Sequence, residues 1–136
     1  MKRTIKDQPT TNDLPNLIKV AEQGDAEAQY QLARMYNKGE GVTRDYGQAV
    51  AWCRKAAEQG HEEAQYNLAE MYREGKGVTR DYEAAYGWYA RSAAHAQGNV
   101  VATLSLDELE KKLTPEQIAR VQKMLSEQAK DAPKTP

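Results

Sequence analysis

Apolar side chains recur three or four positions apart along the middle of the chain, which is the spacing of one face of an α-helix. Between residues 26 and 38 this face comprises Ala28, Leu32, Met35 and Tyr36. Between residues 62 and 74 it comprises Ala64, Leu68, Met71 and Tyr72. Tyr30 and Ala33 fall on another flank of the first segment. We therefore expect each of these helices to bury two sides between neighbouring helices.

A second helix is predicted in each unit, from Tyr46 to about Gln59 and again from Tyr82. Its inward arc contains Ala49, Val50, Trp52, Cys53, Ala56 and Ala57 in the first unit, and Ala85, Tyr86, Trp88, Tyr89 and Ala93 in the second. Two glycines two positions apart separate the helices of each unit, an arrangement typical of a helix that ends on a left-handed residue. Asp45 and Asp81 follow as predicted N-caps of the second helix, each contributing about 1 kcal/mol.

The two units are copies of one another. Residues 21–56 aligned with residues 57–92 give 21 identities in 36 pairs. The run from Gly39 to Tyr46, for example, returns at residues 75–82 with one change. A repeat of 36 residues indicates stacked helix pairs, in which each pair buries its apolar faces against the next.

Degraded copies extend the array towards both ends. Residues 14–23 are expected to form a lone second helix, capped by Asn12 or Asp13. A further first helix is expected after Gly98, with Ala102, Leu106 and Leu109 at its apolar positions. Thr114 and Gln117 then form a capping-box pattern around Pro115, which begins a final helix. Its single apolar stripe, expected to cover the last core surface of the array, comprises Ile118, Val121, Met124 and Leu125.

These observations predict one domain over residues 13–130. It comprises a partial repeat (13–24), repeat one (25–60), repeat two (61–97) and a degenerate repeat with its capping helix (98–130). Residues 1–12 and 131–136 are rich in Pro, Thr and Lys and are predicted to be flexible tails.

The repeat resembles the Sel1-like repeat, a relative of the tetratricopeptide repeat. The resemblance lies in the run from Ala28 to Ala33, in Tyr36, in Gly39-x-Gly41-Val42, and in Asp45-Tyr46, Ala49, Trp52 and Ala56-Ala57. It implies an all-α fold, a right-handed α-solenoid of antiparallel helix hairpins with a 36-residue period, and a protein that binds other proteins. The pattern breaks at Glu110, which stands where the family has Tyr, and no Gly-x-Gly-Val follows it.

Composition argues against several classes of function. Lys and Arg total 19 and Asp and Glu total 20, so the net charge of −1 gives no broad attraction to nucleic acid or to anionic membranes. Cys53 is the only cysteine, so neither an intramolecular disulfide nor a Cys-based zinc site can form. The N-terminus lacks the apolar run of a secretory signal, and no stretch is long enough for a membrane span. We expect a cytoplasmic monomer, with export of a trimmed precursor left open.

No catalytic constellation is marked, so we expect no enzyme activity, no cofactor and no metal. The glycine loops lack the Gly-Lys-Ser/Thr step of a phosphate-binding loop. His61 and His95 suit capping or solvent exposure, and Cys53 suits a small buried residue. Some cysteine-rich secreted relatives of the family have been associated with penicillin binding or hydrolysis. This chain lacks their cysteine pairs and any Ser-x-x-Lys step, so a chromogenic β-lactam should stay intact.

The first helix of each unit keeps a third face that the core does not use. In repeat one this face is Glu27, Gln31, Arg34 and Lys38, and in repeat two it is Glu63, Asn67, Glu70 and Glu74. The family resemblance implies that successive first helices line a concave wall from which relatives contact their partners. Within the first helices, three of the five differences between the two copies fall on this face, which favours a binding surface. The alternative is that Arg34 pairs with Glu70 and Lys38 with Glu74, at about 0 to 1 kcal/mol per pair.

The predicted function is that of a protein-protein interaction module, an adaptor or scaffold whose concave wall holds a peptide or helix of a partner protein. A dedicated inhibitor or immunity-type protein for one partner is an alternative. A self-assembling structural protein, joined through the open ends of the solenoid, is another.

Overall fold

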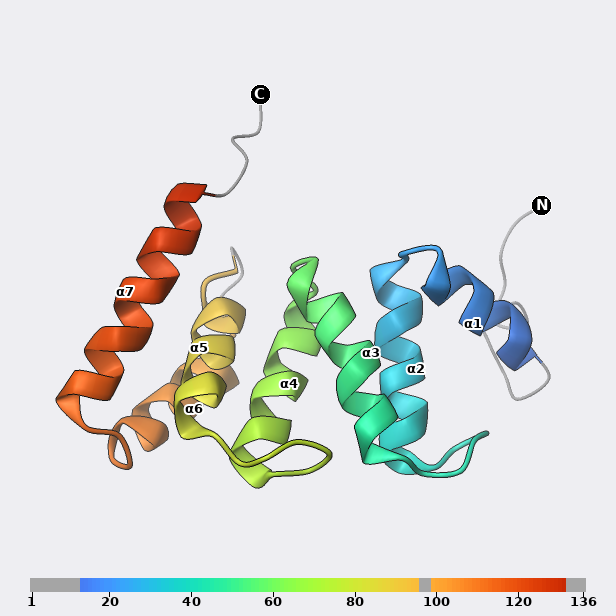
Figure 1. The fold of residues 1–136 in the computed structure, drawn as a ribbon, viewed down its shortest axis with the longest axis horizontal. Coiled ribbons are helices and arrows are strands. Elements are labelled where there is room, and N and C mark those ends of the chain that lie inside the picture. The colour runs from blue at the N-terminus through green and yellow to red at the C-terminus, as the bar shows by residue number, and fades with distance from the viewer. Residues whose placement is uncertain (1–12, 96–98, 132–136) are drawn as a thin grey trace.

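The computed structural model describes residues 13–95 and 99–131. Within those residues the chain forms seven α-helices and no β-strand: α1 (Leu14–Glu22), α2 (Ala26–Lys38), α3 (Tyr46–Glu58), α4 (Glu62–Glu74), α5 (Tyr82–Ala93), α6 (Val100–Glu110) and α7 (Pro115–Asp131). The helices stack side by side into an elongated array, and α2 to α5 alternate in direction (Figure 1). The all-α solenoid predicted from the sequence is confirmed.

The start of each repeat helix follows its local sequence. Gln48 donates its backbone N–H to Asp45 Oδ1 at 3.1 Å, and Ala84 donates to Asp81 Oδ1 at 3.0 Å. Both predicted N-caps of the second helices are therefore confirmed. At the start of α4 the cap is His61, whose Nδ1 accepts from the backbone N–H of Ala64 at 3.1 Å. The capping role expected for this histidine is confirmed too.

The capping box before α7 is also present. Gln117 donates its backbone N–H to Thr114 Oγ1 at 3.1 Å, and Thr114 donates its backbone N–H to Gln117 Oε1 at 2.9 Å. At the other end of the array Asp13 occupies the N-cap position of α1. Asn12, the other predicted cap, lies outside the described residues. The predicted tails 1–12 and 132–136 lie outside them as well, while Asp131 is the last residue of α7 and was wrongly assigned to a tail.

The glycine loops end the first helices and dock neighbouring repeats. Gly75 ends α4 in the left-handed region with φ 73°, and Gly77 follows with φ 74°. A Cβ atom at Gly77 would lie 2.2 Å from the backbone oxygen of Tyr46, at the first residue of α3. The loop of repeat two therefore packs directly on a helix of repeat one, and only glycine allows this approach.

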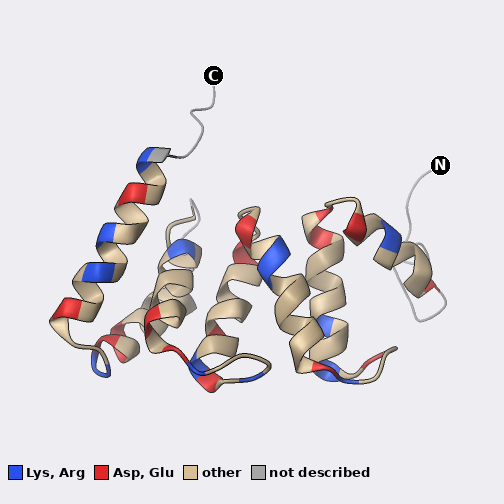
Figure 2. Ribbon diagram, viewed as in Figure 1, with Lys and Arg blue, Asp and Glu red and all other residues tan. Residues whose placement is uncertain are grey.

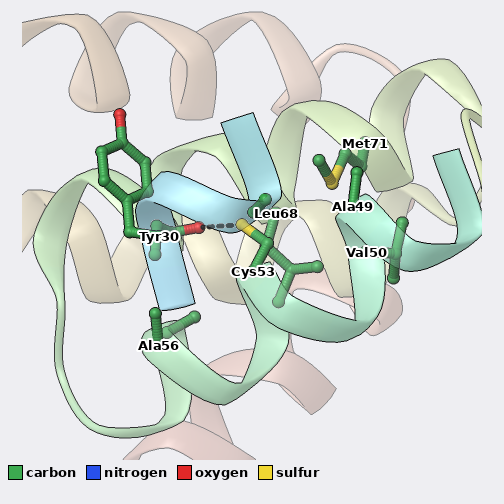
Figure 3. Close-up of a cluster of buried hydrophobic side chains, with 10 residues drawn as sticks. Tyr30, Ala49, Val50, Cys53, Ala56, Leu68 and Met71 are labelled. Atoms are coloured by element: carbon green, nitrogen blue, oxygen red, sulfur yellow. Dashed lines mark hydrogen bonds between the residues drawn. The ribbon is translucent and has the colours of Figure 1, made fainter. Parts of the chain in front are cut away.

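Small side chains let the helices of the core come close together. Ala49, Ala56 and Ala64 are fully buried among α2, α3 and α4, beside Cys53 and Leu68. Figure 3 shows this cluster, with the Cys53 thiol pointing towards a main-chain oxygen. A second cluster joins α4 to α7 around Tyr89 and Leu109, and a third joins α1 to α2. The two tryptophans are half-buried and pack against these clusters as expected.

Helix α7 covers the last core surface with most of its predicted stripe. Val121 is buried, and Ile118 and Leu125 are partly buried against the cluster that contains Leu109. Met124 is 42% exposed, so its assignment to the buried stripe is wrong. The reason is that α7 runs beside α5 and presents Met124 to the groove over that helix. In the described part of the chain, no helix is both long enough and apolar enough to cross a bilayer.

Candidate partner-binding surface

The first helices of the repeats, α2, α4 and α6, form one side of the array, which we call the first-helix wall. Direct contacts hold α2 and α4 together along it. Asn67 Nδ2 donates to the Tyr30 hydroxyl oxygen at 3.3 Å, and His61 Nε2 lies 2.7 Å from Glu27 Oε2. The Tyr30 and His61 rings are also in contact, with their centres 4.5 Å apart and their planes inclined by 31°. These contacts fix the relative positions of the polar faces predicted to bind a partner.

A cleft of about 440 Å³ opens between α2 and α4. Six of the eight residues predicted to bind a partner line it: Arg34, Lys38, Glu63, Asn67, Glu70 and Glu74. The other two, Glu27 and Gln31, lie outside the cleft lining. Glu27 is bound to His61, and Gln31 donates to Glu27 Oε1 at 3.5 Å. Asn37 and Tyr30 complete the polar lining, and Tyr30 was missing from the predicted set.

The pairing of acids and bases across the cleft, which was the alternative interpretation, is wrong. Glu70 is bound within its own helix to Arg73 at 2.7 Å, and it also accepts a hydrogen bond from the Tyr89 hydroxyl. Glu74 pairs with Lys76 at 3.4 Å. Neither Arg34 nor Lys38 has a salt bridge to any described residue.

The two sides of the cleft therefore differ in charge. The α2 side carries the unpaired Arg34, whose guanidinium carbon lies 5.8 Å from the centre of the Tyr30 ring, and the unpaired Lys38. On the α4 side, Glu63 lies close enough to Tyr30 that burial and this carboxylate together raise the pKa of the tyrosine. Figure 2 shows both signs of charge distributed along the whole array, so the asymmetry is a local property of this cleft.

The wall changes character at α6. A second pocket of about 440 Å³ lies between α4 and α6, and it shares Glu70 with the first. Val101 and Leu104 line it and are 54% and 59% exposed. They occupy the repeat positions of Glu63 and Tyr66, if Ala102 is aligned with Ala64. The sequence thus carried a signal for this apolar surface, but the predicted binding surface included residues of repeats one and two only.

The interior of the array offers no reactive nucleophile at Cys53. Its thiol donates to the backbone oxygen of Ala64 at 3.1 Å, and burial raises the pKa of the thiol to about 12. The nucleophilic form of cysteine is the thiolate, so this residue is unreactive near neutral pH. Among the residues that the structure describes, no group of three or more His, Cys, Asp and Glu side chains is arranged to hold a metal ion.

The Sel1 repeat pattern matches residues 26–61 and 62–96, which together make up just over half of the chain. The chain belongs to the Sel1 repeat family. Each match contains one first helix and one second helix of the array, in agreement with the repeat boundaries seen in α2 to α5. Sel1 repeat proteins generally mediate protein-protein interactions, and the family is generally a non-catalytic helical repeat.

Two solved Sel1 repeat structures are similar to this chain. One is a protective antigen present in uropathogenic Escherichia coli strains that displays an SLR fold, with a TM-score of 0.80 and 37% identity over 87% of this chain and 25% of the antigen. The other is a Sel1 repeat protein from Oxalobacter formigenes, with a TM-score of 0.63 and 40% identity over 66% of this chain and 36% of that protein. The chain thus spans a minor part of both. No curated protein matches it.

Proposed function

We propose that this Sel1 repeat protein is an adaptor that holds a segment of a partner protein in the cleft between α2 and α4, on the concave side of the solenoid. One observation carries the proposal. Arg34 and Lys38 line this cleft without a salt bridge to any described residue, although carboxylates stand on its opposite side. The general role of the family in protein-protein interaction supports the class of function.

The charge asymmetry suits recognition of a partner in one orientation. Glu70 and Glu74 are already neutralised by Arg73 and Lys76, so neither competes strongly for the cations of α2. An incoming carboxylate can therefore form charge-assisted hydrogen bonds with Arg34, which presents a planar set of N–H donors. Charges of this kind contribute more to specificity and to the rate of association than to affinity. The apolar pocket at α6 would add affinity through buried side-chain contacts.

The test is a comparison of partners captured from the host lysate by the wild type and by the double variant Arg34→Glu, Lys38→Glu. The variant should lose at least about nine tenths of the captured partner, because two favourable contacts become repulsive. Its helical content should not change, since both side chains are exposed. The matched control is Lys123→Glu, Lys130→Glu, which makes the same change of charge at two exposed positions of α7.

Equal capture by the wild type and the α2 variant would refute the assignment of this cleft. A loss in both variants would indicate a general effect of net charge rather than a site. The identity of what is captured separates the predicted alternatives. One partner held in a fixed ratio indicates a dedicated inhibitor, several weaker partners indicate an adaptor, and capture of the chain itself indicates self-assembly.

A further inference from the structure

A groove of about 720 Å³ lies on the side of the array formed by the second helices, and it shares no residue with the cleft between α2 and α4. α5 forms its floor, with Ala84, Gly87 and Trp88 turned towards it. α7 and the C-terminal end of α3 form its walls, and in Figure 1 these two helices lie on opposite sides of α5. The predicted binding surface of the repeats uses none of these helices.

The groove exists because α7 lies close against α5. Gly87 is buried beneath α7, and a Cβ atom there would lie 3.5 Å from Val121 Cγ1 and 3.8 Å from Met124 Cε. Glu83 pairs with Arg120 at 2.6 Å and so ties the two helices together near their N-terminal ends. Helix α7 thereby forms a wall above Trp88 instead of leaving that indole open to solvent.

Arg91 is the unusual residue of this groove. Its guanidinium carbon lies 4.3 Å from the centre of the Trp88 ring, and burial lowers the pKa of its side chain. It donates a hydrogen bond to Gln128 Oε1, an uncharged acceptor. It has no salt bridge to any described residue, although Glu58 is near enough to oppose the change in its pKa.

The equivalent position of repeat one shows what burial changes. Lys55 stands 36 residues before Arg91, and its Nζ lies 5.5 Å from the centre of the Trp52 ring. Lys55 is exposed to solvent, whereas Arg91 is half-buried under α7. A fully hydrated cation needs no partner. A cation that has lost part of its hydration is stabilised by an anion that takes the place of the lost water. The same repeat position therefore favours anion binding only in repeat two.

We propose that this groove is a second binding site, which takes a segment of a partner protein carrying a carboxylate side chain next to an apolar one. The carboxylate accepts two hydrogen bonds from the flat edge of the Arg91 guanidinium, which the Trp88 ring holds in plane. The apolar neighbour packs against Trp88 and the exposed Met124.

The charges around the groove favour a carboxylate over a phosphate group. Asp81, Glu83 and Glu58 all line it, and together they would repel a dianion more than a monoanion. Asp81 is engaged as the N-cap of α5, and Glu83 is paired with Arg120. Glu58 is therefore the acid that competes with a ligand for Arg91. Since the groove and the cleft share no residue, a test of binding in the groove is independent of a test of binding in the cleft.

The test uses nuclear magnetic resonance of the full chain, titrated with the peptide acetyl-Leu-Glu-Leu-amide. The chain has two tryptophans, and the variant Trp52→Phe assigns their indole N–H signals. The Trp88 indole and the Arg91 side-chain N–H signals should shift and saturate, while the Trp52 signal stays in place and serves as an internal reference. The matched peptide acetyl-Leu-Gln-Leu-amide should bind about tenfold more weakly, because it lacks the charge.

Three variants locate the binding. Arg91→Gln should weaken binding of the glutamate peptide about tenfold, whereas Lys55→Gln, the equivalent change in repeat one, should leave it unchanged. Glu58→Gln should tighten binding roughly two- to fivefold by removing the competing charge. Far-ultraviolet circular dichroism of each variant should match the wild type, since none of the three side chains is fully buried.

Four results would overturn the site. They are no saturable shift at low-millimolar peptide, equal affinity for the glutamate and glutamine peptides, unchanged affinity in a folded Arg91→Gln variant, and tighter binding of a phosphoserine peptide than of the glutamate peptide. Weaker binding in Glu58→Gln would also count against the site, because it would show that Glu58 supports Arg91 instead of competing for it.

Discussion

The variant Gly77→Ala should destabilise the protein much more than Gly75→Ala, although the two glycines have nearly the same backbone conformation. Their φ angles are 74° and 73°, so alanine at either site suffers the same left-handed strain of about 1 to 2 kcal/mol. At Gly75 the nearest atom to an added Cβ is Arg80 Cβ, at 3.2 Å, which a small adjustment relieves.

At Gly77 the added Cβ would lie 2.2 Å from the backbone oxygen of Tyr46 and 2.5 Å from its carbonyl carbon. Those atoms belong to the first turn of α3, which is fixed by its cap, so either the loop or the helix must move. Overpacking of this kind costs a further 1 to 3 kcal/mol, roughly. We therefore expect about 2 to 5 kcal/mol for Gly77→Ala, against about 1 to 2 kcal/mol for Gly75→Ala.

Urea unfolding followed by circular dichroism measures both free energies, and thermal unfolding should show a difference of about 3 to 5 °C per kcal/mol for a chain of this length. Gly24→Ala is the control for strain alone, since its φ is 105° and an added Cβ meets nothing within 4 Å. If Gly77→Ala and Gly75→Ala lost the same stability to within about 0.5 kcal/mol, the close docking of the loop on the preceding repeat would be refuted.

Three further predictions follow from the same contacts. Cys53 should resist alkylation by iodoacetamide at neutral pH and react only on unfolding, because burial raises its pKa to about 12; modification at the rate of a free thiol would contradict its burial. Thr114→Ala should cost about 1 kcal/mol in urea unfolding, because the hydroxyl that caps α7 is lost; an unchanged midpoint would mean that the cap is not formed. Burial is the main cause of the raised phenol pKa values of four tyrosines, Tyr30, Tyr66, Tyr86 and Tyr89. The stability that these phenols contribute is therefore complete below the unfolded-state pKa of about 10. It is lost as the pH rises through their folded-state pKa values. The free energy of unfolding should therefore fall above about pH 10, and less steeply in Tyr89→Phe; equal slopes would contradict the shift at that residue.

The repeat architecture could be predicted because its determinants are local and occur twice. Asp45 and Asp81 are acceptors placed three residues before the N–H groups that they cap, and the glycines that follow the first helices occur at fixed offsets from them. Such signals require no knowledge of the rest of the fold. In the first helices the 36-residue offset then identified the core, because buried residues such as Leu32 and Leu68 match between copies. The second helices differ even in the core, where Tyr89 takes the place of Cys53.

The candidate sites were predictable only in part, because they depend on contacts between helices that sequence spacing does not encode. The polar face of α2 was predicted to bind a partner, but a salt bridge between Arg34 and Glu70 was an equally good interpretation of the same sequence. It fails because Glu70 pairs instead with Arg73, three residues further along its own helix, and accepts a hydrogen bond from Tyr89, whose position depends on how α4 and α5 pack together. The groove over α5 depends on the position of α7, which no repeat pattern describes.

The exposed Met124 supports a second role for α7 besides covering the end of the array. A helix needed only to shield the core would bury all four members of its apolar stripe, and Val121 does lie in the core. Its neighbour Met124 instead lines the groove with Trp88 and the half-buried Arg91, where it stays 42% exposed. Exposed apolar area beside a partly desolvated cation is unfavourable for the free protein, and binding at the proposed second site would decrease both costs. The departure of α7 from the repeat pattern is thus the feature that gives this array a surface that its regular repeats lack.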